Sequence, residues 1–322
     1  RNLELFYPNH PEGVPLIQII DQTQTAMGAR LLRQWMAFPL KELKLIEERQ
    51  ERVQDFLEET ILLEHTEEAL SKIIDIERVM AKVATEKISP RALNQLADSL
   101  EVLENFKKVL MEGSAKHLKV ELEKIPSPQE VLSLLQKTLH PEAPVVVSKG
   151  YVIAAGLSER LDELRSLRDT SQSHLDAMLE RETERTQIPS LKIAFNNVFG
   201  YYIEVRNTHK DKVPEEWVRK QTLVNAERYI TEELKTFETE ILQAGERILA
   251  LEQELFAALI KNLQKNLEVL KQNAAAVARW DVLCGFAKMA QKNNYCCPTM
   301  TATTRLDIQG ARHPVIEKQL PL

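Results

Sequence analysis

The chain has 322 residues, which at about 150 residues per domain predicts two or three domains and enough chain for a sizeable core. Nine glycines and 6% aromatic residues disfavour an all-β sandwich or barrel and favour helices. The net charge of −6 excludes a chain that is basic throughout, so any contact with nucleic acid has to be local.

The first half of the chain is expected to form helices separated by short breaks. The expected helices cover about 15–35, a stretch from about 43, 64–84, 90–112 and 128–139. Ser89 caps the fourth of these, with Pro90 at its first helical position. The first ends near Phe38, because the residue before a proline disfavours the helical region. No fixed period recurs, so the uneven helices predict an irregular bundle and not a repeat array.

A long helix is expected in the second half. Between Tyr229 and Gln272 there is no proline and a single glycine, Gly245. Apolar residues alternate there at spacings of four and three, as in a heptad seam: Ile230, Leu234, Phe237, Ile241, Ala244, Ile248, Leu251 and Leu255. At 1.5 Å per residue such a helix would be roughly 65 Å long, so it needs a partner helix.

The expected partner lies upstream, in residues 157–187. This stretch is densely charged and has its own apolar positions: Leu157, Leu161, Leu164, Leu167, Leu175, Met178 and Leu179. Between the two helical stretches lie β-rich runs at 191–195 and 200–205, joined by a turn-like segment. We therefore expect an antiparallel helical arm that carries a small sheet. A further strand-like run covers 305–310.

The sequence lacks the common signatures of catalysis and of membrane insertion. There is no phosphate-cradling Gly-x-x-x-x-Gly-Lys-Ser/Thr loop, no Gly-x-Gly-x-x-Gly and no Gly-x-Ser-x-Gly elbow. The seven histidines are scattered, and Cys284, Cys296 and Cys297 lack metal-binding spacing, so we expect inert thiols, no metal site and no catalytic residue. No run of about 18 apolar residues and no signal-peptide core occur, which predicts a cytoplasmic protein without a membrane span.

Residues 186–230 differ from the rest of the chain in charge. They hold seven Lys and Arg against five acidic residues, and six of the 18 aromatic residues. Cations together with amide and hydroxyl side chains on a small sheet suit contacts to phosphate oxygens. The excess of two positive charges is a weak footprint for DNA, however. The alternatives are a solvated sheet whose aromatic residues, including Tyr201 and Tyr202, form its own small core, and a lever that binds protein.

Several motifs resemble those of the MutS family of DNA mismatch repair proteins. The longest pair, Phe-Asn-Asn-Val-Phe-Gly-Tyr-Tyr-Ile-Glu-Val at 195–205 and Arg-Lys-Gln-Thr-Leu-Val-Asn-Ala-Glu-Arg-Tyr-Ile-Thr at 219–231, resembles the clamp of that family. Shorter matches follow in the same order as in the family: 1–5, 25–35, 48–50, 75–78, 294–295 and 310–317. The resemblance covers essentially the whole chain.

This resemblance implies a mainly α fold, in which an irregular helical core has long antiparallel coiled-coil arms that carry a small β-sheet clamp. The implied domains are a first core part at 1–169, the clamp at 170–232, a second core part at 233–295 and the start of an ATPase domain at 296–322. Since the chain begins at Arg1 and stops soon after a strand-like run, we expect an excised fragment of a longer protein.

The resemblance also implies a function. The chain would grip duplex DNA through the backbone without sequence preference and would link DNA binding to mismatch-reading and ATPase domains that it lacks. No cofactor is expected in the chain itself, whereas the parent protein would use ATP and Mg²⁺. The parent's expected partners are mismatched double-stranded DNA, a second MutS subunit and a MutL-like protein, in a bacterial cytoplasm at the nucleoid. The alternative is a helical scaffold that docks a protein through its arms without contacting DNA.

The phosphate-contacting residues implied by the family motif are Arg219, Lys220, Gln221, Thr222 and Asn225. Composition alone adds three cations of the same region: Arg206, Lys210 and Lys212. Val224 departs from the family, some members of which have a lysine there, so that one backbone contact is in doubt. Glu227 and Arg228 are adjacent in sequence and are candidates for a salt bridge at the root of the arm.

Overall fold

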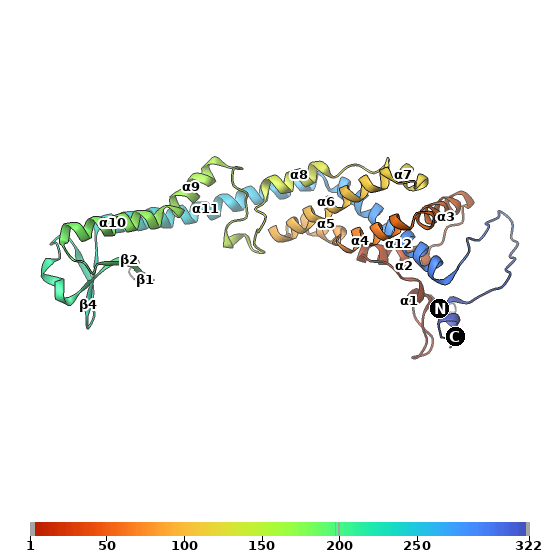
Figure 1. The fold of residues 1–322 in the computed structure, drawn as a ribbon, viewed down its shortest axis with the longest axis horizontal. Helices are drawn as coiled ribbons and strands as arrows, with labels where there is room; N and C mark the ends of the chain where they lie inside the picture. The colour runs from red at the N-terminus through yellow and green to blue at the C-terminus, as the bar shows by residue number, and fades with distance from the viewer. Residues whose placement is uncertain (1–3, 197, 199, 320–322) are drawn as a thin grey trace. The chain divides into compact units, whose positions relative to one another are not determined.

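A computed structural model describes residues 4–196, 198 and 200–319 (Figure 1). The chain divides into two compact units. We call Arg1–Pro141 with Leu259–Leu322 the helical unit, and Glu142–Ala258 the arm unit. Among the described residues, no helix is long and apolar enough to cross a membrane.

The helical unit is built from helices that precede and follow the arm unit in sequence. Their bounds are α1 (Leu16–Ile20), α2 (Ala26–Ala37), α3 (Leu43–Glu58), α4 (Thr60–Ser71), α5 (Ile76–Ala84), α6 (Pro90–Glu112), α7 (Lys116–Leu122), α8 (Gln129–Thr138), α12 (Leu267–Asn293) and α13 (Pro314–Gln319). Helix α12 is the centre of the core and packs against α2, α3, α4 and α5. Its middle part, from Asn273 to Ala287, is buried on nearly all sides, and Trp280 is only 1% exposed.

The N-terminus of α2 is held by a buried carboxylate of α12. Asp281 accepts hydrogen bonds from the backbone N–H groups of Gln24 and Thr25, each at 2.8 Å, and from the Thr25 hydroxyl at 2.7 Å. The Thr25 hydroxyl in turn accepts from the N–H of Gly28 and caps the helix. Any Cβ at Gly28 would overlap the Asp281 side chain. The small residue in this motif therefore lets α2 and α12 approach closely.

This capping also corrects one sequence prediction. The single helix expected over 15–35 is two helices, α1 and α2. Thr25 lies before α2 as its N-cap, and its N–H donates to Asp281 and not to a carbonyl of the preceding turn, so the helix does not continue through this position. The helix expected over 64–84 is likewise two helices, and Asp75 caps the second of them. Helix α7 was not predicted, and the strand expected at 305–310 is irregular chain. The helix expected over 90–112 is confirmed with its Ser89 cap.

The arm unit contains two shorter helices, most of one long helix and one sheet; from Leu259 on, the long helix belongs to the helical unit. The helices are α9 (Glu159–Asp169), α10 (Ser171–Thr186) and α11 (Glu232–Lys265), with short 3-10 helices η1 (Val147–Lys149) and η2 (Asn207–Lys212). The strands are β1 (Lys192–Asn196), β2 (Gly200–Arg206), β3 (Val218–Thr222) and β4 (Ala226–Ile230). They form an antiparallel sheet in the order β1-β2-β4-β3, which we call the tip sheet.

Ion pairs along the arm show that its helices run antiparallel, as predicted. Arg165 of α9 pairs with Glu252 of α11, and Arg181 of α10 pairs with Glu233 near the start of α11. The expected long helix was wrong at both ends, however, because Tyr229 and Ile230 belong to β4 and α12 starts separately at Leu267. The break follows Asn266, whose backbone leaves the helical region (φ −103°, ψ 9°).

The heptad seam holds only in the first half of α11. Leu234, Phe237, Ala244 and Ile248 are at most 8% exposed, as a buried seam requires. Further along, Leu251 and Leu255 are half-buried, and the residues that follow each of them, Glu252 and Phe256, are buried instead. The buried face therefore rotates by one residue at the point where Arg165 meets Glu252. The fold is mainly α with a small sheet, as the sequence predicts.

The close approach of α2 and α12 predicts that Gly28→Ala destabilises the protein. The added methyl group would have to displace a buried, fully engaged carboxylate, so we expect a loss of about 1–3 kcal/mol in the free energy of unfolding. Urea unfolding followed by circular dichroism measures this loss. Gly245→Ala is the matched control, because it lies in α11 with no atom within 4 Å of an added Cβ. It should stabilise the chain by roughly 0.5–1 kcal/mol. Equal effects of both substitutions would contradict this account of Gly28.

Candidate nucleic-acid interface

One face of the tip sheet is buried against the helices of the arm unit. Ile203, Val205 and Tyr229 on this face are at most 7% exposed, and they form one cluster with residues of α10 and α11. The helical members of the cluster are Leu175, Met178, Leu234 and Phe237. Trp217, just before β3, joins the cluster, and Tyr201 packs against it. Tyr201, Trp217 and Tyr229 therefore pack as predicted, but into a core shared with the helices and not into one of the sheet's own. Tyr202 lies on the other face, Phe195 is 51% exposed, and Phe199 lies outside the described residues.

The other face carries a polar network centred on Arg228. Its guanidinium lies 4.4 Å from the ring centre of Tyr202. Its Nε donates to Glu204 at 3.2 Å and its Nη1 donates to the Gln221 side chain at 2.9 Å. The suggested Glu227–Arg228 salt bridge is therefore wrong, because adjacent residues of a strand point to opposite faces and each side chain pairs with a different partner. The charge of Arg228 is therefore engaged by partners within the sheet.

Strand β3 forms an edge of the tip sheet and exposes most of the predicted site residues. Arg219 lies opposite Tyr229 and Gln221 lies opposite Arg228, so the register slips by one residue and Lys220 is the extra residue of a β-bulge. Arg219, Lys220 and Thr222 are exposed, and Gln221 is half-buried. A bulge and two cations also block this edge against pairing with another strand.

A buried carboxylate holds Arg219 at the edge. Glu227 is 9% exposed, accepts a hydrogen bond from Arg219 Nη1 at 3.2 Å and accepts another from the Tyr229 hydroxyl. The Tyr229 hydroxyl, with smaller effects from the charges of Arg219 and Lys210, lowers the pKa of Glu227. Burial, followed by the bond to Glu227, raises the pKa of Tyr229 to about 12. At neutral pH Glu227 is thus ionised, and Arg219 is a positioned but partly neutralised cation.

The β3–β4 turn brings further predicted residues together. Asn207 supports this turn, because its side-chain amide donates to the carbonyl of Val224 at 2.9 Å and its N–H donates to the carbonyl of Asn225 at 3.2 Å. Arg206 lies opposite Ala226 in the sheet register, so Arg206 and Asn225 meet at the same end of the sheet. Val224, the departure from the family motif, projects from this turn and is 92% exposed.

The remaining two candidates lie in η2, which packs against β2 and β4. Lys210 is exposed, and its charge acts on Glu227. Lys212 is exposed and donates from Nζ to the carbonyl of Gln187 at 3.2 Å. The structure therefore gathers the eight predicted residues on β3, the β3–β4 turn, the end of β2 and η2. The supporting roles of Asn207 and Glu227 were not predicted, because they depend on which side chains the sheet register places opposite one another.

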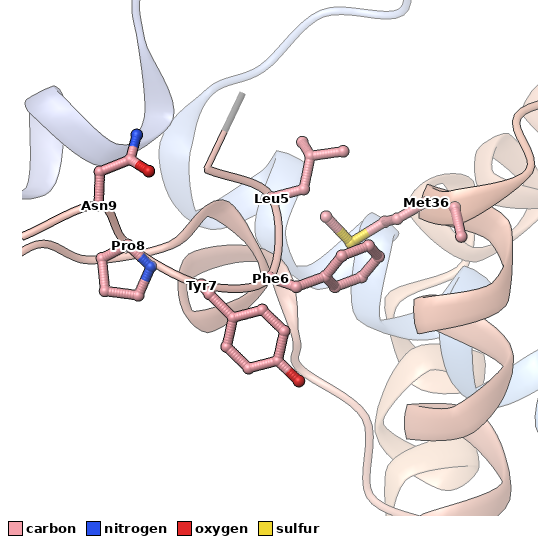
Figure 2. Close-up of a pocket in the computed structure, with 7 residues that line it drawn as sticks. Leu5, Phe6, Tyr7, Pro8, Asn9 and Met36 are labelled. Atoms are coloured by element: carbon pink, nitrogen blue, oxygen red, sulfur yellow. The ribbon is translucent and has the colours of Figure 1, made fainter. Parts of the chain in front are cut away.

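Other parts of the described chain offer weaker candidates. A hollow of about 710 Å³ is lined by Leu5, Phe6, Tyr7, Pro8, Asn9, Met36 and Ala37. Figure 2 shows Phe6 directed toward Met36 and the Tyr7 ring directed away from it. These side chains carry no charge and no group suited to acid–base chemistry at neutral pH.

Within the described ranges, no three His, Cys, Asp or Glu side chains gather in a way that could hold a metal ion. Burial raises the pKa of the Cys284 thiol to about 12, which makes it unreactive.

Comparison with known proteins identifies the family. The family model for MutS domain III matches residues 1–287. The chain belongs to the MutS family. It is 49% identical over 321 residues to the DNA mismatch repair protein MutS of Christiangramia forsetii, and 47% identical over 322 residues to that of Flavobacterium johnsoniae. The MutS of Porphyromonas gingivalis is 47% identical over 325 residues. Each comparison covers 100% of this chain but only 36–37% of the relative.

In this MutS-family chain, the hydroxyl of Tyr229 should stabilise the tip sheet at neutral pH. Tyr229→Phe leaves the buried carboxylate of Glu227 without one donor, which should cost about 1–3 kcal/mol at pH 7. The bond lowers the pKa of Glu227 below its usual 4.5, so its contribution is present above pH 4.5 and is lost as the pH falls further. The destabilisation should therefore shrink in acid.

Thermal unfolding of wild type and variant between pH 3 and pH 7 tests this prediction. Tyr202→Phe is the control, because Tyr202 lies on the opposite face and contributes its ring to Arg228. A Tyr229→Phe effect that is the same at all pH values, or that Tyr202→Phe reproduces, would show that the loss does not come from the Glu227 carboxylate.

Proposed function

We propose that the tip sheet of this MutS-family chain holds duplex DNA by its sugar–phosphate backbone, without reading sequence. The observation that supports this most strongly is the gathering of exposed cationic, amide and hydroxyl side chains on the edge strand β3, the β3–β4 turn, the end of β2 and η2. These side chains are Arg206, Lys210, Arg219, Lys220, Thr222 and Asn225. Such groups donate to phosphate oxygens, and phosphate contacts position a duplex without specifying its bases.

The charge of the tip argues for weak binding that is sensitive to salt. Arg219 shares its charge with Glu227, and Arg228 is engaged by Glu204 and Gln221. Lys220, at the bulge, makes no ion pair with any described carboxylate. With few free cations we expect binding to only a few phosphates, and each bound phosphate adds about −0.9 to the slope of log affinity against log salt. Such a grip can form and release readily.

We further propose that α11 links this grip to the rest of the protein. The helix begins at Glu232, two residues after β4, and its last residues, from Leu259 on, belong to the helical unit. A single helix without an internal break therefore starts at the sheet that would hold DNA. Helix α10 is joined to its beginning by the Arg181–Glu233 ion pair and by the apolar cluster.

The relatives that share this sequence are DNA mismatch repair proteins about 2.7 times as long as the chain, given their coverage of 36–37%. In a protein of that length we propose that the tip acts on mismatched double-stranded DNA, together with a second MutS subunit and a MutL-like partner. ATP hydrolysis with Mg²⁺ and a cytoplasmic location are part of the same proposal. These roles rest on family membership and not on any site described above.

Removing the two cations of the edge strand should weaken DNA binding equally for all sequences. For Arg219→Gln with Lys220→Gln, we expect lower affinity and a salt slope that is shallower by about 1 for each phosphate that is no longer bound. Fluorescence anisotropy with matched and mismatched duplexes at several salt concentrations measures both quantities. Lys41→Gln with Lys44→Gln is the control, because it removes the same charge from exposed positions just before and within the first turn of α3.

The outcomes separate the two function classes. A weakening confined to the tip variant and equal for both duplexes supports a backbone grip. Preference of the wild-type chain for mismatched DNA would contradict it. If neither the wild-type chain nor the tip variant binds DNA at low salt, the result would instead favour a scaffold that docks a protein through its arms.

The proposed link through the arm is tested in a protein that contains this chain and is as long as its MutS relatives. Arg181→Cys with Glu233→Cys, bridged by a short bis-maleimide, should hold α10 against α11 and reduce the effect of ATP on DNA release. The two single-cysteine variants treated with the same reagent are the controls, because they also account for the exposed Cys296 and Cys297. Unchanged release in the bridged protein would contradict the proposed link while leaving the DNA grip itself intact.

A further inference from the structure

Two motifs of the sequence that the DNA grip does not use meet in the helical unit. Trp35 ends the segment at 25–35 and Arg49 is the middle residue of Glu-Arg-Gln at 48–50. The Arg49 guanidinium carbon lies 3.4 Å from the ring centre of Trp35. Trp35 comes from α2 and Arg49 from α3, so this stack joins two helices at the surface of the core.

The stack forms one wall of a hollow of about 250 Å³, which we call the Arg49 hollow. Four cations line it: Arg49, Arg52, Lys124 and Arg279. Two carboxylates, Glu48 and Glu121, also line it. The hollow thus has an excess of positive charge in a chain whose net charge is −6.

Both carboxylates of the hollow are already engaged. Glu121 lies 3.1 Å from Arg52 Nε and 2.5 Å from Arg279 Nε, between the two side chains. Glu48 lies 3.7 Å from Arg52 Nη2. Among the residues that the structure describes, no carboxylate forms an ion pair with Arg49 or with Lys124. Two cations of the hollow are therefore left without an anion.

The position of Arg49 makes this unusual. Its side chain is half-buried, and burial, together with the neighbouring charge of Arg52, lowers the pKa of Arg49. A partly desolvated cation is costly without an anionic partner, and stacking on an indole ring offsets only part of that cost. The stack does fix the guanidinium plane, which leaves its N–H groups ready to donate in parallel to a planar acceptor.

We propose that the Arg49 hollow is a docking site for the carboxylate of an acidic polypeptide segment. Charge complementarity supplies the first argument, since Arg49 and Lys124 lack an anion. The walls supply the second, because Leu40, Leu45 and the ring of Trp35 line the same hollow and Leu45 is 40% exposed. A segment in which Asp or Glu is followed by an apolar residue would satisfy both.

Duplex DNA fits this site poorly. A DNA backbone is bound by cations spread along an exposed strip, whereas the hollow offers two free cations within about 250 Å³ and apolar walls. The docking site lies in the helical unit and is independent of the grip proposed for the tip sheet. Its failure in the test below would leave the DNA proposal unaffected, and the reverse also holds.

The test uses the 322-residue chain and a defined probe, a fluorescein-labelled peptide in which Asp and Glu alternate with Leu. We expect saturable binding by anisotropy, an affinity about tenfold or more lower in Arg49→Gln, and no binding of the same peptide with Asn and Gln in place of the acids. Arg33→Gln is the matched control, because it removes the same charge from an exposed position of α2. Arg49→Lys keeps the charge but not the planar fork, and it should also bind more weakly.

Each result bears on the proposal. If Arg49→Gln fails to fold by circular dichroism, Arg49→Lys and the amide peptide still decide it. Equal weakening in Arg33→Gln and Arg49→Gln would overturn it, because that would indicate general charge attraction. Absence of saturable binding by the wild type would also overturn it. If a labelled duplex, and not the peptide, loses affinity in Arg49→Gln, the hollow binds nucleic acid and the proposal is wrong.

Discussion

The tip of this chain depends on the burial of one face of a four-stranded sheet against α10 and α11. A small sheet needs its apolar face covered to be stable, and the apolar cluster with α10 and α11 supplies that cover. The same cluster fixes the register of β4, which sends Glu227 to the covered face and Arg228 to the open one. The placement of every charged side chain at the edge follows from that register.

Pairing within the sheet then decides which cations remain available. Arg228 is engaged on three sides, by a ring, a carboxylate and an amide. Arg219 keeps an exposed head but shares its charge with a buried carboxylate. A surface that is rich in arginine and lysine by composition therefore presents fewer free charges than a count suggests. A small number of free charges suits the weak, salt-sensitive grip on DNA that we propose for the tip sheet.

The helical unit shows the opposite case. In the Arg49 hollow the carboxylates pair with Arg52 and Arg279, so the cation that is stacked on Trp35 has no ion pair with any carboxylate in the part of the chain that the structure describes. In the core, by contrast, the buried Asp281 has each of its oxygens satisfied by α2 and its preceding turn. The Arg49 hollow contains unpaired charge, which is the physical reason for proposing it as a docking site. Asp281 is completely paired, which is why its role is structural.

Sequence alone was enough for the elements whose signals are local: the Ser89 cap of α6, the two β-rich runs, the antiparallel arm and the residues of the family motif. It was not enough for the break between α1 and α2, because Asp281 lies far from Thr25 along the chain, with a sequence separation of 256 residues. Nor did it show where α11 begins, since Tyr229 and Ile230 suit a heptad seam and a strand equally well and only pairing with the neighbouring strands β2 and β3 decides between them. The folded chain alone showed which carboxylates pair with Arg219 and Arg228 and that Arg49 stacks on Trp35, because the partner of a charged side chain is set by the fold and not by its neighbours in sequence.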